Sequence, residues 1–125
     1  MGAKAGGGDV VEEHLPLTHL WYHVLLVLWD QGLHGYGIIK EIERRTEGRL
    51  VPETGTLYTA LRRMQDEGLL DGERERGGGR RGATYRLTAR GRSVLKAETQ
   101  RLHRLVDMAR AMKILDPRLA GEVRR

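Results

Sequence analysis

The chain has 125 residues, of which 39% are hydrophobic and 31% are charged, and Lys and Arg outnumber Asp and Glu by 22 to 17. This length fits one domain with a short appendage and leaves no room for a second folding unit. The absence of cysteine excludes disulfides, Cys-ligated zinc and thiol catalysis, while the formal net charge of +5 favours anionic partners.

Residues 1–9, MGAKAGGGD, are rich in glycine and predict a flexible tail outside the fold. This segment lacks the long apolar region of a secretory signal, and no stretch of the chain approaches the ~18 apolar residues of a membrane span. We therefore expect a cytoplasmic protein.

The first predicted helix begins after Thr18, its N-cap, and runs through Gln31, with Gly32 ending it. Apolar residues cover more than half of its circumference, so we expect it to be the most buried helix. Those residues are Leu20, Trp21, Val24, Leu25, Val27 and Leu28.

A tight connection over residues 33–35 leads to a second predicted helix, over residues 36–46. Its expected inner face is Tyr36, Ile39 and Ile42, and Gly48 is expected to end it. Its charges nearly cancel, so this helix is predicted mainly to support its neighbours.

The third predicted helix lies within residues 52–70 and is the element around which the chain is organised. Thr54 and Thr56 can offer hydroxyls to its first free backbone N–H groups, and Gly68 closes its far end. An inner face repeats at i, i+4 and i+7, formed by Leu57, Leu61 and Met64.

The outer face of the same helix carries hydroxyls and guanidinium groups, which suit base edges and phosphates. It comprises Thr56, Thr59, Arg62, Arg63 and Asp66, with Tyr58 at its edge. The alternative is an ordinary solvated helix face, and this helix alone leaves both open.

Two short strands are predicted next, over residues 70–76 and 83–88, joined by the loop GGGRRG. In the second strand, Ala83, Tyr85 and Leu87 alternate with polar residues, so one face packs inward. Between Arg74 and Arg92 there are seven Arg and one acid, a local charge of +6. The positive charge of the chain is therefore concentrated at this hairpin.

A long helix is predicted from Thr88, its N-cap, to about Leu115, with Pro117 preventing much further extension. Its rough heptad pattern favours a partner helix, although packing on its own domain stays an alternative. The residues expected to form a dimer contact are Leu95, Leu102, Leu105, Val106, Ala109 and Met112.

Three helices followed by a basic hairpin predict a winged helix-turn-helix, a mainly α, α+β fold with a long C-terminal dimerisation helix. We expect a DNA-binding domain over residues 10–88 and a dimerisation helix with a short tail over residues 89–125. In such a fold the third helix enters the major groove, and the Arg-rich wing at Arg80 and Arg81 neutralises phosphates alongside.

Four separated motifs resemble the PadR family of bacterial transcriptional regulators. They are His34-Gly35-Tyr36, Gly55-Thr56-Leu57-Tyr58 with Leu61, Gly68-Leu69-Leu70, and Tyr85-Arg86-Leu87-Thr88 with Gly91. The similarity extends over about residues 15–115 and includes the short-tailed members. Thr59 departs from the pattern, because the family commonly has Pro at that position. The resemblance implies a dimeric repressor in which Thr56 and Tyr58 contact DNA.

The predicted partner is double-stranded DNA carrying a palindromic operator. The residues expected to contact it are Lys40, Thr54, Thr56, Tyr58, Thr59, Arg62, Arg63, Arg74, Arg76, Arg80 and Arg81. A winged-helix module that binds protein instead, or a domain excised from an enzyme, are the competing interpretations. The basic hairpin argues against the first of these.

Trp21, Tyr22 and Trp29 either pack in the core or line a pocket for a small aromatic or lipophilic effector, between the first and the last helix. His19 and His23 have a spacing that can ligate a metal, but no acid or cysteine joins them at a matching position. No nucleophile is paired with a base. We therefore expect no metal, no cofactor and no catalysis.

Overall fold

The computed structural model describes residue 11 and residues 13–74, 82–116 and 118. Its elements follow one another in the order α2 (His19–Val27), β1 (Leu33–His34), α3 (Gly35–Arg45), α4 (Thr54–Asp66), β2 (Leu70–Arg74), β3 (Ala83–Leu87) and α5 (Ala89–Ala111). Within these described ranges, no helix is both long and apolar enough to cross a bilayer.

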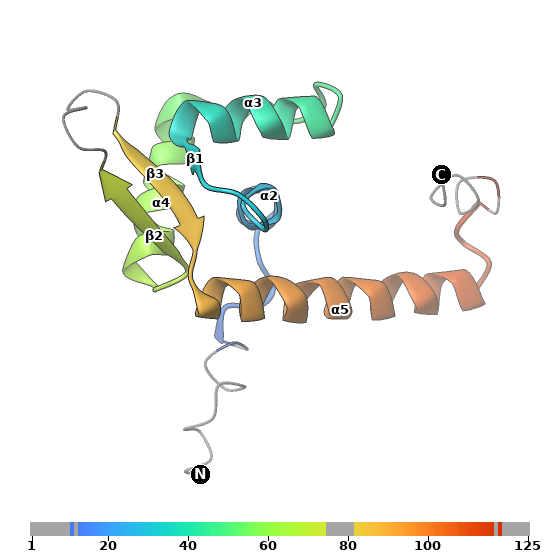
Figure 1. Ribbon diagram of the computed structural model, residues 1–125. Coiled ribbons are helices and arrows are strands. Elements are labelled where there is room, and N and C mark those ends of the chain that lie inside the picture. The colour runs from blue at the N-terminus through green and yellow to red at the C-terminus, as the bar shows by residue number, and fades with distance from the viewer. Residues whose placement is uncertain (1–10, 12, 75–81, 117, 119–125) are drawn as a thin grey trace, which may run out of the picture.

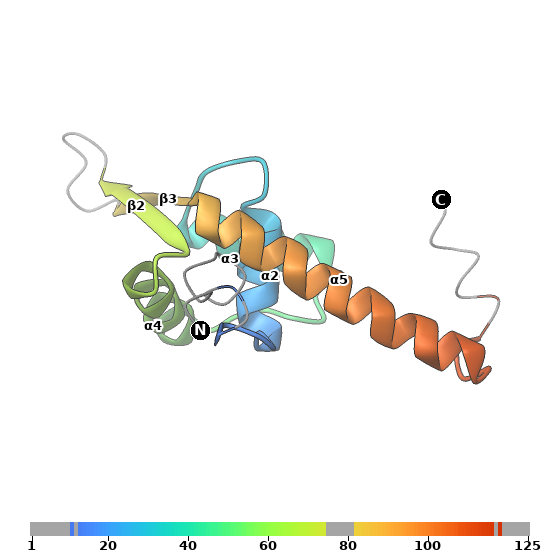
Figure 2. The same ribbon diagram turned by 90° about the horizontal axis from the view of Figure 1, so that it is seen from below.

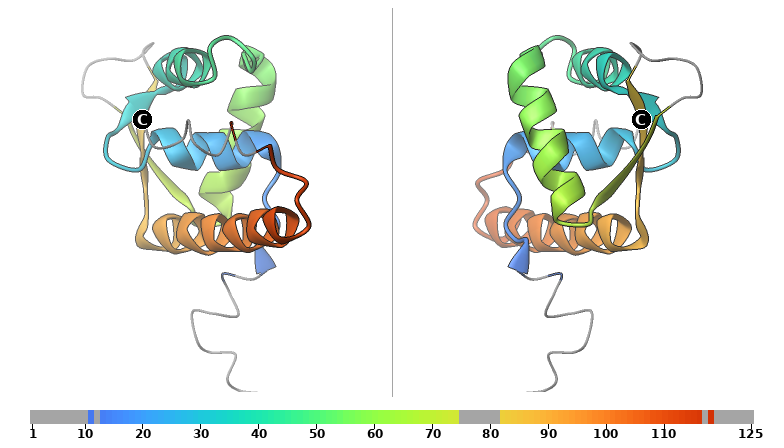
Figure 3. Two further views of the ribbon diagram at one scale, coloured as in Figure 1. Left: turned by 90° about the vertical axis from the view of Figure 1, so that its right-hand side faces the viewer. Right: turned by 90° about the vertical axis from the view of Figure 1, so that its left-hand side faces the viewer.

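Helix α2 is central to the fold. It lies between α3 on one side and α5 on the other, with α4 and the strands at its two flanks (Figure 1 and Figure 3). Three of its apolar side chains, Val24, Leu25 and Val27, are 0% exposed, and Leu28, its C-cap, is 1% exposed. The prediction that this is the most deeply packed helix fits that burial, because α2 contacts neighbours on several sides.

The start of α2 agrees with the prediction from the sequence, and its end does not. Thr18 is the N-cap, and its hydroxyl accepts a hydrogen bond from the Trp21 backbone N–H. The helix ends at Val27 rather than at Gln31, with Leu28 as its C-cap. The Gln31 side chain donates to the Val27 carbonyl at 3.1 Å. Gly32 does not end the helix. Its α-carbon faces Arg86, whose guanidinium carbon would lie 2.7 Å from an added Cβ.

Helix α3 and the residues on either side of it correct three predictions. Its buried residues are Gly35, Ile38, Ile39 and Ile42, whereas Tyr36, expected on the inner face, is 66% exposed. Glu47, at φ 54°, is the first left-handed residue after the helix, and Gly48 at φ 79° follows it. Residues 33–34, expected to be a connection, form the short strand β1.

Helix α4 begins with Glu53 as its N-cap, without a side-chain capping bond, so the expected capping by Thr54 and Thr56 is wrong. The predicted end is confirmed. Gly68 has φ 79°, and the Leu69 N–H donates to the Met64 carbonyl at 2.9 Å. This closure satisfies carbonyl groups that the last turn leaves free.

The sheet has three antiparallel strands in the order β1-β3-β2. Leu70 pairs with Leu87 at one end of the β2–β3 ladder and Arg74 with Ala83 at the other, while His34 of β1 pairs with Thr84. The predicted hairpin is confirmed. The third strand was missed because two residues carry no alternation pattern.

Helix α5 begins as predicted, with the Thr88 hydroxyl accepting from the Gly91 N–H. It ends at Ala111, before the predicted Leu115, because Lys113 adopts φ 61° and the Ile114 N–H returns to the Ala109 carbonyl at 3.0 Å. This closure stops the helix without the help of proline. Figure 2 shows α5 extending well past the remainder of the fold.

Candidate nucleic-acid interface

The outer surface of α4 is the part of the molecule best suited to a groove of DNA. Its predicted inner residues Leu57, Leu61 and Met64 are at 0% exposure, and Ala60, which was not predicted there, is also buried at 6%. The predicted outer residues are exposed, namely Thr54, Thr56, Tyr58, Thr59, Arg62, Arg63 and Asp66. The core thus holds one face of α4 and leaves hydroxyls and guanidinium groups on the other.

One edge of this face meets the beginning of α3. A Cβ added to Gly35 would overlap the Tyr58 hydroxyl, so the Tyr58 ring lies directly over the Gly35 α-carbon. Tyr58 is still 38% exposed. The side chain predicted to reach outward therefore also fixes the distance between α3 and α4, and only glycine fits beneath it.

The opposite edge of α4 borders an open groove of about 530 Å³ shared with the start of α2. Thr56 and Arg63 line it together with Thr18 and Trp21, and the Thr56 hydroxyl donates to Glu53 Oε1 at 3.3 Å. Thr59 also reaches this groove. The predicted contacts on α4 therefore divide between two edges of one helix face.

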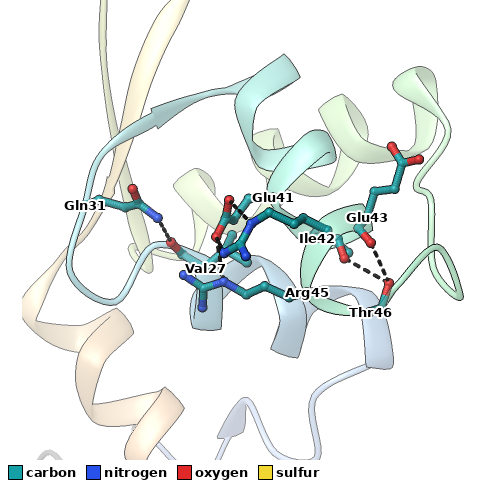
Figure 4. Close-up of polar contacts among 8 residues, drawn as sticks. Val27, Gln31, Glu41, Ile42, Glu43, Arg45 and Thr46 are labelled. Carbon is teal, nitrogen blue, oxygen red and sulfur yellow. Dashed lines mark hydrogen bonds and ion pairs between the residues drawn. The ribbon is translucent and has the colours of Figure 1, made fainter.

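Most charged side chains of α3 form ion pairs with one another within the helix. Arg44 and Arg45 donate to Glu41 at 2.6 and 2.7 Å, and these bonds lower the Glu41 pKa to about 2. Figure 4 shows Glu41 and Arg45 above the end of α2, with Glu43 on another side of α3. Lys40 pairs with Glu43 at 3.7 Å, so it lies on that other side.

The wing is only partly described. The backbone of Arg74 belongs to β2 and pairs with Ala83. The predicted phosphate contacts Arg76, Arg80 and Arg81 lie outside the described residues, as does the loop around them. Their role stays a prediction, while the paired strands establish where the loop leaves the sheet.

Helix α5 divides into two halves. In the first half Val94 and Leu95 are 0% and 4% exposed and belong to the core, so Leu95 is not available for a dimer contact. In the second half the exposed apolar residues are Leu105, Val106 and Met108, and the exposed Met112 and Ile114 follow directly after the helix. Leu102 and Ala109 are half-buried. The predicted stripe therefore begins about two turns later than the sequence pattern indicated.

The three residues predicted for an effector pocket do not share one. Trp21 lines the groove beside α4, and the Tyr22 hydroxyl lies 2.7 Å from the Thr99 hydroxyl. Trp29 lies under Arg92, whose guanidinium carbon is 4.7 Å from a Trp29 ring centroid. An open, mostly apolar groove of about 570 Å³ does lie between α2 and α5, lined by Leu26, Trp29, Leu95, Lys96, Thr99 and Gln100.

His19 and His23 contact each other edge to face, with ring centroids 4.6 Å apart. Burial and the neighbouring His19 lower the pKa of His23, which favours the neutral ring. In the part of the chain that the structure describes, no group of three His, Asp or Glu side chains is placed to hold a metal ion.

Comparison with known proteins places this geometry in a family. Residues 24–97 match the model of the transcriptional regulator PadR-like family. The chain is 30% identical over 110 residues to the transcriptional regulator YqjI of Escherichia coli (strain K12), covering 88% of this chain and 52% of that protein. It therefore spans about half the length of that relative.

Two solved structures share the fold. A PadR family transcriptional regulator from Eggerthella lenta has a TM-score of 0.64 and 27% identity, covering 87% of this chain and 96% of that one. Bacillus subtilis PadR in complex with operator DNA has a TM-score of 0.58 and 24% identity, covering 66% of this chain and 46% of that one. The family model matches more than half of the residues. The chain therefore belongs to the PadR-like family of transcriptional regulators.

Proposed function

We propose that the protein is a dimeric repressor that binds a palindromic operator through α4 and the basic wing and releases it when a small aromatic or lipophilic effector binds. In this proposal residues 10–88 form the DNA-binding domain and residues 89–125 the dimerisation helix with its tail. The exposed face of α4 carries the proposal, because it presents Thr59, Arg62 and Arg63 on a helix whose other face is locked in the core.

The DNA partner is supported by charge and by fold. The segment from Arg74 to Arg92, which runs from the hairpin into the first turn of α5, holds seven Arg and one acid, and such an excess of positive charge suits phosphate binding. Bacillus subtilis PadR, which shares this fold, was solved in complex with operator DNA. A protein-binding winged helix would not need such a concentration of positive charge at its wing.

The dimer is supported by the second half of α5. Met108 and Met112, one turn apart, are 62% and 72% exposed, and Ile114, just beyond the helix, is 68% exposed, which is an unusual amount of neighbouring apolar surface. A second copy of the same helix would cover it, and a two-fold dimer presents two copies of α4 to the two halves of a palindrome.

The effector is supported by the groove between α2 and α5. Its lining residues Trp29 and Leu95 offer apolar surface, and Thr99 and Gln100 offer hydrogen-bonding groups. Such a mixture suits a small, mostly apolar molecule. The apolar residues proposed to form the dimer interface also belong to α5. A ligand that binds between α2 and α5 would therefore change the distance between the two DNA-binding domains of the dimer.

The test is selection of duplexes from a random-sequence pool by the full chain, followed by titration of the selected and scrambled duplexes over a range of salt. We expect two inverted half-sites whose centres are about 10 base pairs, or a multiple of that, apart. Replacing both Arg80 and Arg81 by Ala should weaken binding to both duplexes and flatten the salt slope by up to ~0.9 per lost phosphate contact.

A matched control removes two positive charges elsewhere, by replacing Arg49 and Arg104 with Ala. Both residues are exposed and lie outside α4 and the wing. Equal losses in the two double variants would mean that only the net charge matters. No enriched sequence and no retention on heparin would support the protein-binding alternative instead.

A further inference from the structure

We propose that Tyr36 and Lys40, on the exposed side of α3, hold one backbone phosphate of the bound duplex between the wing and α4. This inference rests on the proposed function and adds a residue, Tyr36, that the sequence pattern assigned to the core. The ligand is the phosphodiester backbone, bound without regard to base sequence.

The first observation is the exposure of Tyr36. Its neighbours Gly35 and Ile38 are buried, and it is 66% exposed. A tyrosine usually buries much of its ring in a domain of this size, because the ring contributes a large apolar area. Tyr36 is not among the side chains packed in or against the hydrophobic core, so folding alone does not explain an aromatic ring here.

The second observation is where Tyr36 stands. His34 pairs with Thr84 at the start of β3, one residue from Ala83, where the wing enters the sheet. Gly35, next along the chain, lies under the Tyr58 hydroxyl of α4. Figure 1 shows α3 beginning beside this part of β3, with α4 passing behind. Tyr36 is thus placed at the meeting point of the two elements proposed to contact DNA.

The third observation is the partner of Tyr36. Lys40, one turn further along α3, places its ammonium 5.6 Å from the Tyr36 ring centroid and 3.7 Å from a Glu43 carboxylate oxygen. Both side chains of that ion pair are about half exposed, at 56% and 42%, so the pairing is weak. The ammonium is therefore available to a stronger anion.

The remaining cations of α3 cannot compete for that role. Arg44 and Arg45 both donate to Glu41, at 2.6 and 2.7 Å, so their charge is already paired within the helix. The Tyr36 hydroxyl can donate a hydrogen bond, and the Lys40 ammonium that lies over the same ring carries a positive charge. Both groups are common phosphate contacts, so together they can hold one phosphate. Lys40 was predicted to contact DNA, and the structure supplies its companion.

The experiment titrates the full chain with a fluorescein-labelled duplex of scrambled sequence, and with the selected operator, over a range of salt. Tyr36→Phe should weaken binding to both duplexes by the same factor, about tenfold, and leave the salt slope unchanged because no charge is lost. Lys40→Gln should weaken both and flatten the slope by up to ~0.9. Arg49→Gln, which removes one positive charge beyond the far end of α3, is the control and should leave the slope unchanged.

Circular dichroism of each variant checks the fold. If the parent binds and both Tyr36→Phe and Lys40→Gln match it, or if Tyr36→Phe weakens the operator alone, the phosphate site is wrong while the proposed function stands. If the parent binds neither duplex, the proposed function itself is wrong and this site falls with it.

Discussion

Glu98 and Arg101 form a doubly bonded ion pair inside the junction between α5 and the start of the chain. Arg101 Nε lies 2.6 Å from Glu98 Oε1 and Arg101 Nη2 lies 2.8 Å from Glu98 Oε2. The Leu17 backbone N–H also donates to Glu98 Oε2, at 3.1 Å. Glu98 is only 2% exposed, so its charge depends on these three donors.

The Arg101 hydrogen bonds are the main reason that the Glu98 pKa lies below its ordinary value of 4.5. A lowered pKa means that Glu98 stabilises the fold fully above about pH 5 and that this contribution is lost as the pH falls through 4.5 towards the folded-state pKa. Glu98→Gln should lower the free energy of unfolding at pH 7 by about 2 kcal/mol.

Urea unfolding at pH 7 and at pH 4 measures both effects. Between pH 7 and pH 4, the free energy of unfolding should fall less for Glu98→Gln than for the parent protein. Glu41→Gln is the contrast, because the Arg44 and Arg45 partners of Glu41 are well exposed and the cost should stay below about 1 kcal/mol. Equal costs for the two variants would refute the special role of Glu98.

The first turn of α5 packs through a glycine against Leu69, in the connection between α4 and β2. A Cβ at Gly91 would overlap the Leu69 carbonyl oxygen and would lie 3.2 Å from its carbon. Gly91→Ala should therefore destabilise the fold by roughly 1 to 3 kcal/mol, since backbone must move. Gly55→Ala, where nothing lies within 4 Å, should stabilise α4 by up to ~1 kcal/mol. Thermal unfolding of the two variants should shift in opposite directions.

The dimer should depend on the second half of α5 and not on its first half. Replacing both Leu105 and Met112, 47% and 72% exposed, with Glu should give a monomer that keeps the parent's helix content. Leu95→Ala should instead lower the free energy of unfolding by about 2 to 5 kcal/mol and leave the native protein dimeric. Light scattering at tens of micromolar separates the two, and a dimeric double variant would exclude this surface as the interface.

Recognition of the operator's base sequence should depend mainly on the residues in the middle of the exposed face of α4. Thr59→Ala or Arg62→Ala should change the ranking of operators substituted one base pair at a time, at ~1 to 3 kcal/mol for a lost base contact. Tyr58→Phe should weaken all operators by one smaller factor, because its hydroxyl lies at the α3 edge. A parent-like ranking for both Thr59→Ala and Arg62→Ala would assign sequence reading to other residues.

The amino-acid sequence determined what depends on neighbours along the chain. The spacing of Leu57, Leu61 and Met64 defined the buried face of α4, and Thr18, Thr88 and Gly68 marked helix ends through bonds to backbone groups a few residues away. The alternation in residues 83–87 was sufficient to identify the hairpin. These features follow from the periods of helix and strand and from local capping, which tertiary contacts left unchanged.

Only the tertiary structure decided whether certain apolar residues of the helices are buried in the core or exposed to solvent. Tyr36 and Leu95 are both apolar at helical spacing, yet one is exposed and the other is in the core, because α3 is held through Gly35 beneath Tyr58 and α5 through Gly91 on Leu69. Strand β1 forms because Leu33 and His34 pair with Tyr85 and Thr84 of β3. Contacts between residues far apart in the chain set these outcomes, and no periodic pattern within one segment encodes them.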